Sequence, residues 1–264
     1  ARGEIANKLA NHRLTRRYVD IGGLDLLLMR ANPLTNTVQN LALMAMERGV
    51  RVVNDPTGIA LTRSKSWLAS LPEVPRPATL VTTDPESARL FAEGQSEGVV
   101  LKPALGSGGR GVTMVSDPAR VSRAMVDVTR AQAGPVVVQG YLPDAVHGEK
   151  RIFWVNGRIV GGYLRKRAPG AFHHNLQRGG LPEPTSITEV DRGICSAIGP
   201  HLRRNGIVIA GLDIIGGALV ECNTLNPGGI HYAEAFRKQD TPSIAAQTLQ
   251  LITGEWNTTE VKHA

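Results

Sequence analysis

Apolar positions in the first third of the chain follow two different spacings. Residues 24–29 (LDLLLM) form a short apolar run that predicts a buried strand, and residues 37–48 carry apolar side chains at helical spacing. A second apolar run follows directly at residues 50–53. The order strand, helix, strand is typical of a parallel α/β unit. Asn54-Asp55-Pro56 ends this unit, and residues 59–71 predict one further helix.

A proline-rich stretch at residues 72–77 (PEVPRP) is the strongest indication of a domain boundary in the chain. Beyond it, short apolar runs alternate with amphipathic stretches. The strands expected there are residues 79–82, 98–102, 112–115 and 136–139. The helices expected there are residues 119–130, 187–205 with an interruption near Gly199-Pro200, and 242–251.

Two pairs of apolar runs in this later part are joined by two-residue turns. They are residues 151–155 and 158–164, joined at Asn156-Gly157, and residues 207–215 and 218–222, joined at Gly216-Gly217. Such dipeptides favour the left-handed backbone that tight hairpin turns require. Antiparallel hairpins mixed with helices predict an α+β fold after residue 77, following an α/β N-terminal domain.

Composition narrows the classes of partner. Lys and Arg number 30 and Asp and Glu number 23, so the net charge is +7, which suits either nucleic acid or a small polyanion. Aromatic residues for base stacking make up only 4%, and the basic residues are scattered, which favours a small anionic ligand over nucleic acid. No apolar run reaches about 18 residues, so no membrane span is expected. The two cysteines lack metal-binding spacing and fit a reducing cytoplasm.

A glycine-rich segment follows a lysine at the end of a predicted strand. After Lys102-Pro103 come residues 106–111 (GSGGRG), whose four glycines leave the backbone free to point N–H groups at phosphate oxygens. The letters satisfy the GxGxxG pattern of dinucleotide-binding proteins, but that pattern requires a helix directly afterwards. Residues 112–115 predict a strand instead. We therefore interpret the segment as a hairpin lid over phosphates, rather than as a Rossmann turn or an unstructured surface hairpin.

Three side chains with hard oxygen donors lie on the second predicted hairpin. Period-two alternation places Glu221 and Asn223 on one face of their strand and Cys222 on the other, and Asp213 reaches the first face across the turn. Two carboxylates and an amide oxygen suit Mg²⁺ that also holds ATP phosphates. Acids flanked by apolar residues are costly to bury unpaired, which argues against a merely solvated edge. The sequence therefore predicts a magnesium site on this hairpin.

Arg151, Arg165 and Arg178, together with Asn175, form a further set of candidates. Arginine forks hold carboxylates or phosphates, although composition alone makes an exposed solubilising role equally reasonable for any one of them. His173-His174 resembles a metal pair, but adjacent histidines on a loop rarely chelate one metal together. No metal is therefore assigned to them.

Together these segments resemble the glutathione synthetase branch of the ATP-grasp superfamily. The similar stretches occur in the family's order over nearly the whole chain, and their ordered series is more specific than any one of them. They are Leu26-Leu27-Leu28-Met29-Arg30, Val53-Asn54-Asp55-Pro56, Leu101-Lys102-Pro103 with the glycine segment, Gly148-Glu149-Lys150-Arg151, Asn175-Leu176 with Gly179-Gly180, Gly211-Leu212-Asp213-Ile214-Ile215-Gly216, and Glu221-Cys222-Asn223.

The resemblance implies an ATP-grasp fold in which two α+β lobes hold a nucleotide between them. Residues 1–77 would form the N-terminal α/β domain and a linker, and that domain would be incomplete because the family has further residues before the Arg30 strand. Residues 78–142 would form the smaller lobe with its glycine-rich lid. Residues 143–264 would form the larger lobe with the Mg²⁺ and substrate sites.

The resemblance also implies roles for individual residues. Nucleotide contacts are implied for Lys65, Lys102, Gly106, Ser107, Gly108, Gly109, Gln139, Tyr141, Leu142 and Glu149. Mg²⁺, or Mn²⁺ in its place, would be held by Asp213, Glu221 and Asn223. Catalytic contacts with the transferred phosphate and the acyl group are implied for Arg151, Arg165 and Asn175. Substrate contacts are implied for Arg30, Asn226, Gly228 and Gly229.

The reaction implied is phosphorylation of a carboxylate by ATP, followed by attack of an amine on the acyl phosphate. Its demands match the residues, because cations neutralise charge shared between phosphate and carboxylate, and a lid keeps water away. The substrates would be small molecules such as amino acids or short peptides. A homo-oligomer is expected.

Two departures from the family pattern concern substrate recognition. His173 stands where the family's flap usually carries an arginine, and residues 225–229 (LNPGG) stand where it usually has Ser-Pro-Thr. The pair γ-glutamylcysteine and glycine therefore stays open. So do another ATP-grasp branch, such as a D-alanine ligase, and a nucleotide-binding module without catalysis.

Overall fold

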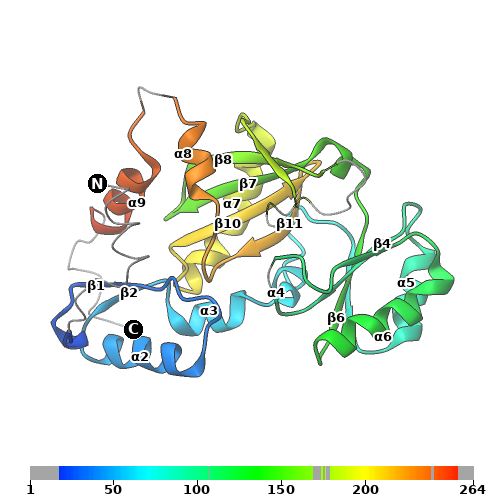
Figure 1. Ribbon diagram of the computed structural model, residues 1–264, viewed down its shortest axis with the longest axis horizontal. Helices are drawn as coiled ribbons and strands as arrows, with labels where there is room; N and C mark the ends of the chain where they lie inside the picture. Colours follow the sequence, from blue (N-terminus) through cyan, green and yellow to red (C-terminus); the bar gives the residue numbers. More distant parts are fainter. Residues whose placement is uncertain are drawn as a thin grey trace.

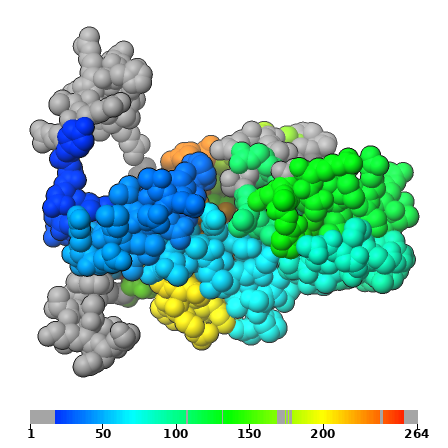
Figure 2. Space-filling view, turned by 90° about the horizontal axis from the view of Figure 1, so that it is seen from below, coloured from blue at the N-terminus to red at the C-terminus, as the bar shows by residue number. Residues whose placement is uncertain are grey.

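The computed structural model describes residues 18–106, 108–168, 174, 176, 179–238 and 241–254. Over these residues the strands form three sheets, with helices packed against them (Figure 1). A four-stranded sheet lies at the right of Figure 1, a five-stranded sheet at the upper centre, and the N-terminal unit at the lower left. Seen from below, blue N-terminal residues lead through cyan residues to the green four-stranded region along one face (Figure 2).

The N-terminal strands form a parallel pair. β1 (Leu26–Leu28) pairs with β2 (Arg51–Val53), and α2 (Asn36–Glu47) connects them. A 3-10 turn, η1 (Ile21–Gly23), precedes β1. Thr35 begins α2 because its side-chain oxygen accepts a hydrogen bond from an N–H of the first turn. The expected strand–helix–strand unit is confirmed.

The single helix expected at residues 59–71 is wrong, because two helices occupy this stretch. α3 (Pro56–Thr62) and α4 (Lys65–Ala69) are separated by Arg63 and Ser64. The Ser64 side chain accepts a hydrogen bond from an N–H of α4, so a serine caps a new helix where the apolar spacing alone indicated continuity.

The smaller of the two large sheets is antiparallel, with the order β3-β6-β4-β5. Its strands are β3 (Thr79–Thr82), β4 (Val99–Pro103), β5 (Thr113–Val115) and β6 (Val136–Gly140). The elements that accompany it are α5 (Pro85–Glu93), η2 (Pro118–Arg120) and α6 (Val121–Ala131). Apolar side chains of α5, α6 and the strands form its core, including Leu101, Met125 and Val138.

The chain enters and leaves this sheet at one place. The Gly140 N–H donates to the Ala78 carbonyl at 2.9 Å, so the two connections lie side by side. The Leu219 N–H donates to the Pro75 carbonyl at 2.8 Å and so fastens the entering segment to the five-stranded sheet. Residues 79–140 therefore form one continuous segment whose two connections lie side by side, and the Lys65 N–H holds it at a second place by donating to the Ala104 carbonyl at 2.8 Å.

The five-stranded sheet is antiparallel, with the order β11-β10-β7-β8-β9. Its strands are β7 (Glu149–Val155), β8 (Arg158–Lys166), β9 (Leu181–Glu183), β10 (Ile209–Ile215) and β11 (Ala218–Asn223), and η3 (Pro143–His147) leads into β7. α7 (Glu189–Arg204) packs on one face with α3 and α4, and α8 (Ile230–Ala235) and α9 (Ile244–Thr253) pack on the other. Alternation along β7 sends Ile152 and Trp154 to the first core and Phe153 and Val155 to the second.

Both predicted two-residue hairpin turns are confirmed. The backbone φ angles are 45° and 89° at Asn156 and Gly157, and 54° and 79° at Gly216 and Gly217. Positive φ at both central residues matches the twist of the flanking strands. The second turn pairs Ile215 with Ala218 and Ile214 with Leu219, and an irregularity between Asp213 and Ile214 then shifts the register so that Asp213 lies opposite Glu221.

The interruption expected in α7 is wrong, because the helix continues through Pro200. Proline removes one helical hydrogen bond. The same helix buries Ile194, Ile198 and Leu202 against the five-stranded sheet, and this apolar packing keeps the helix continuous.

The helices α5 and α8, the strand β9 and the 3-10 turns η1 and η3 were not predicted from the sequence. A signal for α5 was present, since Asp84 accepts hydrogen bonds from two N–H groups of its first turn and Pro85 occupies the first helical position. Within the described part of the chain, no helix combines the length and the hydrophobicity that crossing a membrane requires.

Asn54 ties the N-terminal unit to the five-stranded sheet. It is 3% exposed, and its Nδ2 donates to the carbonyls of Ile209 and Thr224, each at 2.7 Å. Its Oδ1 accepts from the N–H groups of Val208 and Ile209 at 2.8 and 2.7 Å. One buried amide thus satisfies four backbone groups at the start of β10 and just after β11.

We expect Asn54→Ala to lower the free energy of unfolding by about 3–6 kcal/mol, because buried backbone groups would lose their partners. Urea unfolding followed by circular dichroism measures this loss. Asn36→Ala, at an exposed position of α2, is the matched control and should change stability by less than about 1 kcal/mol. An equal, small effect of the two substitutions would contradict the role of Asn54.

Candidate functional site

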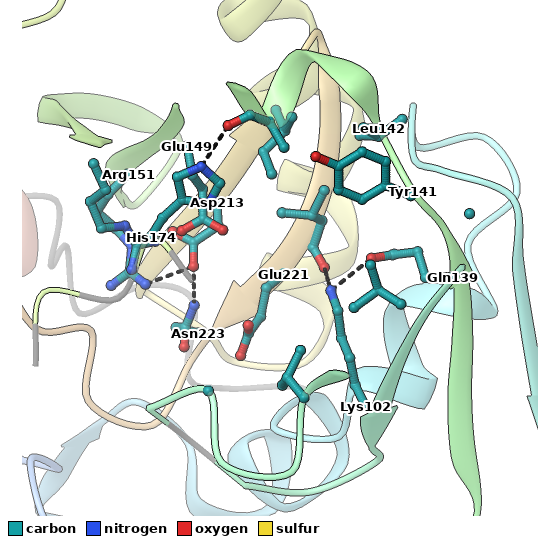
Figure 3. A pocket seen from close by; sticks show the side chains of 18 of the residues that line it. Lys102, Gln139, Tyr141, Leu142, Glu149, Arg151, His174, Asp213, Glu221 and Asn223 are labelled. Atoms are coloured by element: carbon teal, nitrogen blue, oxygen red, sulfur yellow. Dashed lines mark hydrogen bonds and ion pairs between the residues drawn. The ribbon is translucent and has the colours of Figure 1, made fainter. Parts of the chain in front are cut away.

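The candidate site lies between the two larger sheets, in a cavity of about 150 Å³ that we call the inter-sheet cavity (Figure 3). Side chains from β4 and β6 reach it from one side, and side chains from β7, β8, β10 and β11 reach it from the other. The sequence-predicted residues that line it are Lys102, Gly108, Gly109, Gln139, Tyr141, Leu142, Glu149, Arg151, Arg165, Asp213, Glu221 and Asn223.

Lys102 is a buried ammonium group without an anionic partner. It is 9% exposed, and its Nζ donates to Gln139 Oε1 at 2.7 Å and to the Val220 carbonyl at 3.5 Å. No carboxylate in the described part of the chain forms an ion pair with it. Burial lowers the pKa of Lys102, because removal from water disfavours the charged form. A buried charge held only by neutral oxygens is suited to an incoming anion.

Asp213 lies at the centre of a hydrogen-bonded cluster on the opposite wall. The β10–β11 register places Asp213 opposite Glu221, and the β10–β7 register places it opposite Arg151. Arg151 donates through Nε to Oδ1 at 2.5 Å and through Nη2 to Oδ2 at 2.7 Å. Arg165 Nη2 donates to Oδ1, and Asn223 Nδ2 donates to Oδ2 at 3.1 Å. Four N–H donors therefore fill the acceptor positions of this carboxylate.

The cluster perturbs two acidic groups in opposite directions. Burial raises the pKa of Asp213, but the charges of Arg151 and Arg165 outweigh it and lower the pKa to about 2. Burial raises the pKa of Glu149 to about 7, although Arg165, 2.6 Å away, opposes the shift. Asp213 is therefore a fixed anion, whereas Glu149 titrates near neutral pH.

The glycine-rich segment connects antiparallel strands, as expected. β4 pairs with β5 in an antiparallel hairpin, so the Rossmann alternative is excluded by the strand that follows the glycines. Gly108 and Gly109 line the cavity with φ angles of 70° each, a left-handed conformation that glycine adopts freely. Ser107, also predicted here, lies outside the described residues.

Lys65 joins the glycine-rich segment to the hairpin opposite. Its Nζ donates to the Gly106 carbonyl at 3.0 Å and lies 3.5 Å from Glu221 Oε1. Neither Lys65 nor Gly106 lines the inter-sheet cavity. Through these two contacts, Lys65 links Gly106 to Glu221 on β11.

The predicted substrate residues meet at the turn after β11. Arg30 Nη2 donates to the Pro227 carbonyl at 3.3 Å, and Arg151 Nη1 donates to the Gly228 carbonyl at 3.2 Å. Asn226 Oδ1 is buried and makes no hydrogen bond among the described residues. The turn thus lies beside the Asp213 cluster. Gly229, the fourth predicted substrate residue, is the N-cap residue of α8.

Several cavity-lining residues were missed from the sequence. Val100, Val220 and Ile215 are apolar strand residues, and the alternation that places Lys102 on this wall also places Val100 there. His174 Nε2 lies 2.7 Å from the Ala145 carbonyl, and burial lowers the pKa of this imidazole. His174 directly precedes Asn175, a predicted catalytic residue, and this adjacency was the signal that could have identified it. Asn175 itself lies outside the described residues.

Comparison with known sequences decides the family. Residues 64–238 match the family profile described as prokaryotic glutathione synthetase, ATP-grasp domain. The glutathione synthetase of Nostoc sp. is 31% identical over 243 residues, which cover 90% of this chain and 74% of that protein. The glutathione synthetase of Parasynechococcus marenigrum is 34% identical over 235 residues, covering 87% and 75%.

The chain belongs to the prokaryotic glutathione synthetase family. Solved structures agree on the ATP-grasp fold. D-cycloserine synthetase superimposes with a TM-score of 0.67 and 19% identity, covering 88% of this chain and 84% of that one. D-alanine–D-alanine ligase from Bacillus anthracis, in complex with ATP, gives a TM-score of 0.62 and 16% identity, covering 87% and 77%.

In the departure at residues 225–229, Gly229 has a steric reason, whereas a Cβ at Gly228 would meet nothing within 4 Å. Gly229 has a φ of 90°, and a Cβ at this position would lie 2.1 Å from Tyr163 Oη. No side chain fits there without moving Tyr163, which packs against Tyr232 with ring centroids 5.5 Å apart. The other departure, His173, lies outside the described residues.

Proposed function

We propose that this member of the glutathione synthetase family is an ATP-dependent ligase that joins a carboxylate to an amine through an acyl phosphate. The observation that carries the proposal is Lys102, a buried cation with no anionic partner in the described structure. It lies on the wall that faces the β10–β11 hairpin, which carries Asp213 and Glu221. The site carries four cations against three carboxylates: Lys65, Lys102, Arg151 and Arg165 against Glu149, Asp213 and Glu221. This excess of positive charge suits a polyanionic nucleotide.

The residues of the inter-sheet cavity fit ATP. Lys102 and the glycine-rich segment supply a cation and free backbone conformations for phosphates. Apolar Val100, Ile215 and Val220 supply walls for a flat ring. The enclosed 150 Å³ is less than the roughly 300–1,000 Å³ of most ligand pockets, so part of the nucleotide would extend beyond it.

Two residues fit Mg²⁺ directly. Glu221 offers a carboxylate whose one described charged contact is Lys65 at 3.5 Å, and Asn223 keeps Oδ1 available because only its Nδ2 donates. Mg²⁺ commonly takes one or two protein oxygens together with substrate phosphates and water. Asp213 is filled by its four donors and would have to release one of them to become a ligand. Held there, Mg²⁺ would neutralise charge on the phosphates.

Arg151 and Arg165 perform the positioning that acyl phosphorylation requires. Asp213 fixes both guanidinium groups, and Arg165 Nε is buried with no partner among the described residues, which leaves a donor for an oxyanion. Prealigned cations at developing negative charge stabilise a transition state without reorganising water. The glycine-rich segment covering the same cavity would exclude water from the acyl phosphate.

The amine acceptor and the carboxylate donor stay open between γ-glutamylcysteine with glycine and another pair, because no hydroxyl is present in the turn at residues 225–229. An oligomeric form also stays a prediction, which sedimentation velocity would measure. A location in a reducing cytoplasm likewise stays a prediction.

The test is a screen for ADP release with ATP, Mg²⁺, a carboxylate donor and a series of amino acids. We expect ADP only when donor, amine and Mg²⁺ are all present, with the amide product identified by mass spectrometry. EDTA should abolish the signal. Tight ATP binding without ADP release for any pair would favour a nucleotide-binding module instead.

A further inference from the structure

A second cavity of about 320 Å³ adjoins the inter-sheet cavity. The two cavities share Glu221 and Asn223, and the second one extends away from Lys102 toward the N-terminal unit. Its other walls come from the loop at residues 32–34, the glycine-rich segment and residues 224–226 after β11. A molecule in it would therefore have one end at the proposed metal ligands and the other among N-terminal residues.

Two arginines give this second cavity a positive charge. Arg63, between α3 and α4, and Arg110, in the glycine-rich segment, both line it. The one carboxylate on its walls is Glu221, which already pairs with Lys65 at 3.5 Å. Neither arginine lines the inter-sheet cavity where Lys102 lies, so their charges serve a different ligand group from the one that Lys102 meets.

Arg63 is half-buried and its guanidinium is unsatisfied. Its Nε is buried and has no hydrogen-bond partner, and no ion pair involves this side chain within the described residues. Arg165 Nε is likewise buried without a partner, but the Arg165 and Arg151 guanidinium groups are each held by an ion pair with Asp213, whereas the described residues give Arg63 none. Donors left unsatisfied on a cavity wall are costly unless a ligand accepts from them.

We propose that Arg63, assisted by Arg110, is a specificity-determining residue that binds a second carboxylate of the acyl donor, remote from the carboxylate that reacts. This inference rests on the proposed function. The reacting end of the donor lies at Glu221 and Asn223, the apolar part packs on Leu34 and Leu225, and the distal anion meets Arg63. A planar guanidinium suits a carboxylate because it offers paired N–H donors.

The test uses donor pairs that differ only in the distal charge. They are γ-glutamylcysteine against 4-aminobutanoylcysteine, and glutamylalanine against glutaminylalanine. In whichever of these two donor pairs the wild-type enzyme accepts, its kcat/KM should be at least about tenfold higher for the charged donor than for the neutral one. Arg63→Gln should lower kcat/KM for the charged donor by about 10- to 100-fold, mainly through KM, and change the neutral donor by less than about twofold. Arg63→Lys should recover part of the preference.

Arg123→Gln, at an exposed position of α6, is the matched control and should leave both donors unchanged. Thermal unfolding of Arg63→Gln should match wild type, because the described part of the chain gives this side chain no partner. An equal loss with charged and neutral donors, or a raised KM for ATP, would overturn the inference. So would an active wild type with no charge preference. A wild type that releases no ADP with any donor would instead refute the proposed function itself.

Discussion

Lys102→Met should abolish productive ATP binding while leaving the protein folded. Among the described residues, Gln139 and the Val220 carbonyl are the only partners of this ammonium group, which faces the cavity, so its loss removes the charge that phosphates would meet. We expect kcat/KM for ATP to fall by about 1,000-fold, in the range found when a preorganised donor to a transferring group is removed. Calorimetric titration with ATP and Mg²⁺ measures binding, and ADP release measures turnover.

The same substitution should not lower the stability of the protein, although it lowers ATP binding. Methionine fills a similar volume and removes a buried unpaired charge, so the apo-protein should be at least as stable as wild type in urea. Lys238→Met, at an exposed position after α8, is the control and should keep full activity. ATP affinity unchanged in Lys102→Met would remove the basis of the nucleotide site.

Asp213→Asn should lower both turnover and stability. The carboxylate accepts from Arg151, Arg165 and Asn223, and its loss would leave two buried guanidinium groups with too little negative charge. Breaking one side of such a buried cluster costs about 3–5 kcal/mol in the free energy of unfolding. Misplacement of both arginines should reduce kcat by about 100- to 1,000-fold.

The pH dependence separates this role from a purely structural one. Because the folded-state pKa of Asp213 is lowered to about 2, its contribution to stability is complete above the unfolded-state pKa of about 3.9. That contribution is lost as pH falls from about 4 to 2. The stability difference between wild type and Asp213→Asn should therefore shrink over this range in acid–urea unfolding. A difference that is independent of pH would contradict the charge-based explanation. Asp127→Asn, on the exposed side of α6, is the control.

The chemistry of the site could largely be predicted from local sequence. Lys102 before four glycines, and the alternation of Glu221 and Asn223 around Cys222, are patterns contained within a few residues. The turns at Asn156-Gly157 and Gly216-Gly217 were equally local, because left-handed backbone is a property of those residue types. Strand period and turn type alone would have paired Asp213 with Val220, however, so the register shift that brings Asp213 opposite Glu221 was not contained in these patterns.

Other features depend on contacts between distant segments. The saturation of Asp213 requires the registers of β7, β8 and β10, which no local pattern specifies. Arg63 was unremarkable in the sequence, since its significance comes from a cavity formed by segments about 160 residues apart. The continuation of α7 through Pro200 likewise reflects packing on a sheet rather than local preference.

Because the two connections of residues 79–140 lie side by side, the candidate site groups are divided between two sheets. Lys102 and Gln139 lie on paired strands of that segment, whereas Asp213, Glu221 and Asn223 lie on the other sheet. A rotation about the Ala78–Gly140 contact would carry the first pair as a unit and leave the internal geometry of both sets intact. Such a pivot would widen the opening between them and would break the hydrogen bonds from Lys65 to Ala104 and Gly106 and from Lys102 to Val220. Product escape would then require a swing of one lobe, with no strand pairing broken.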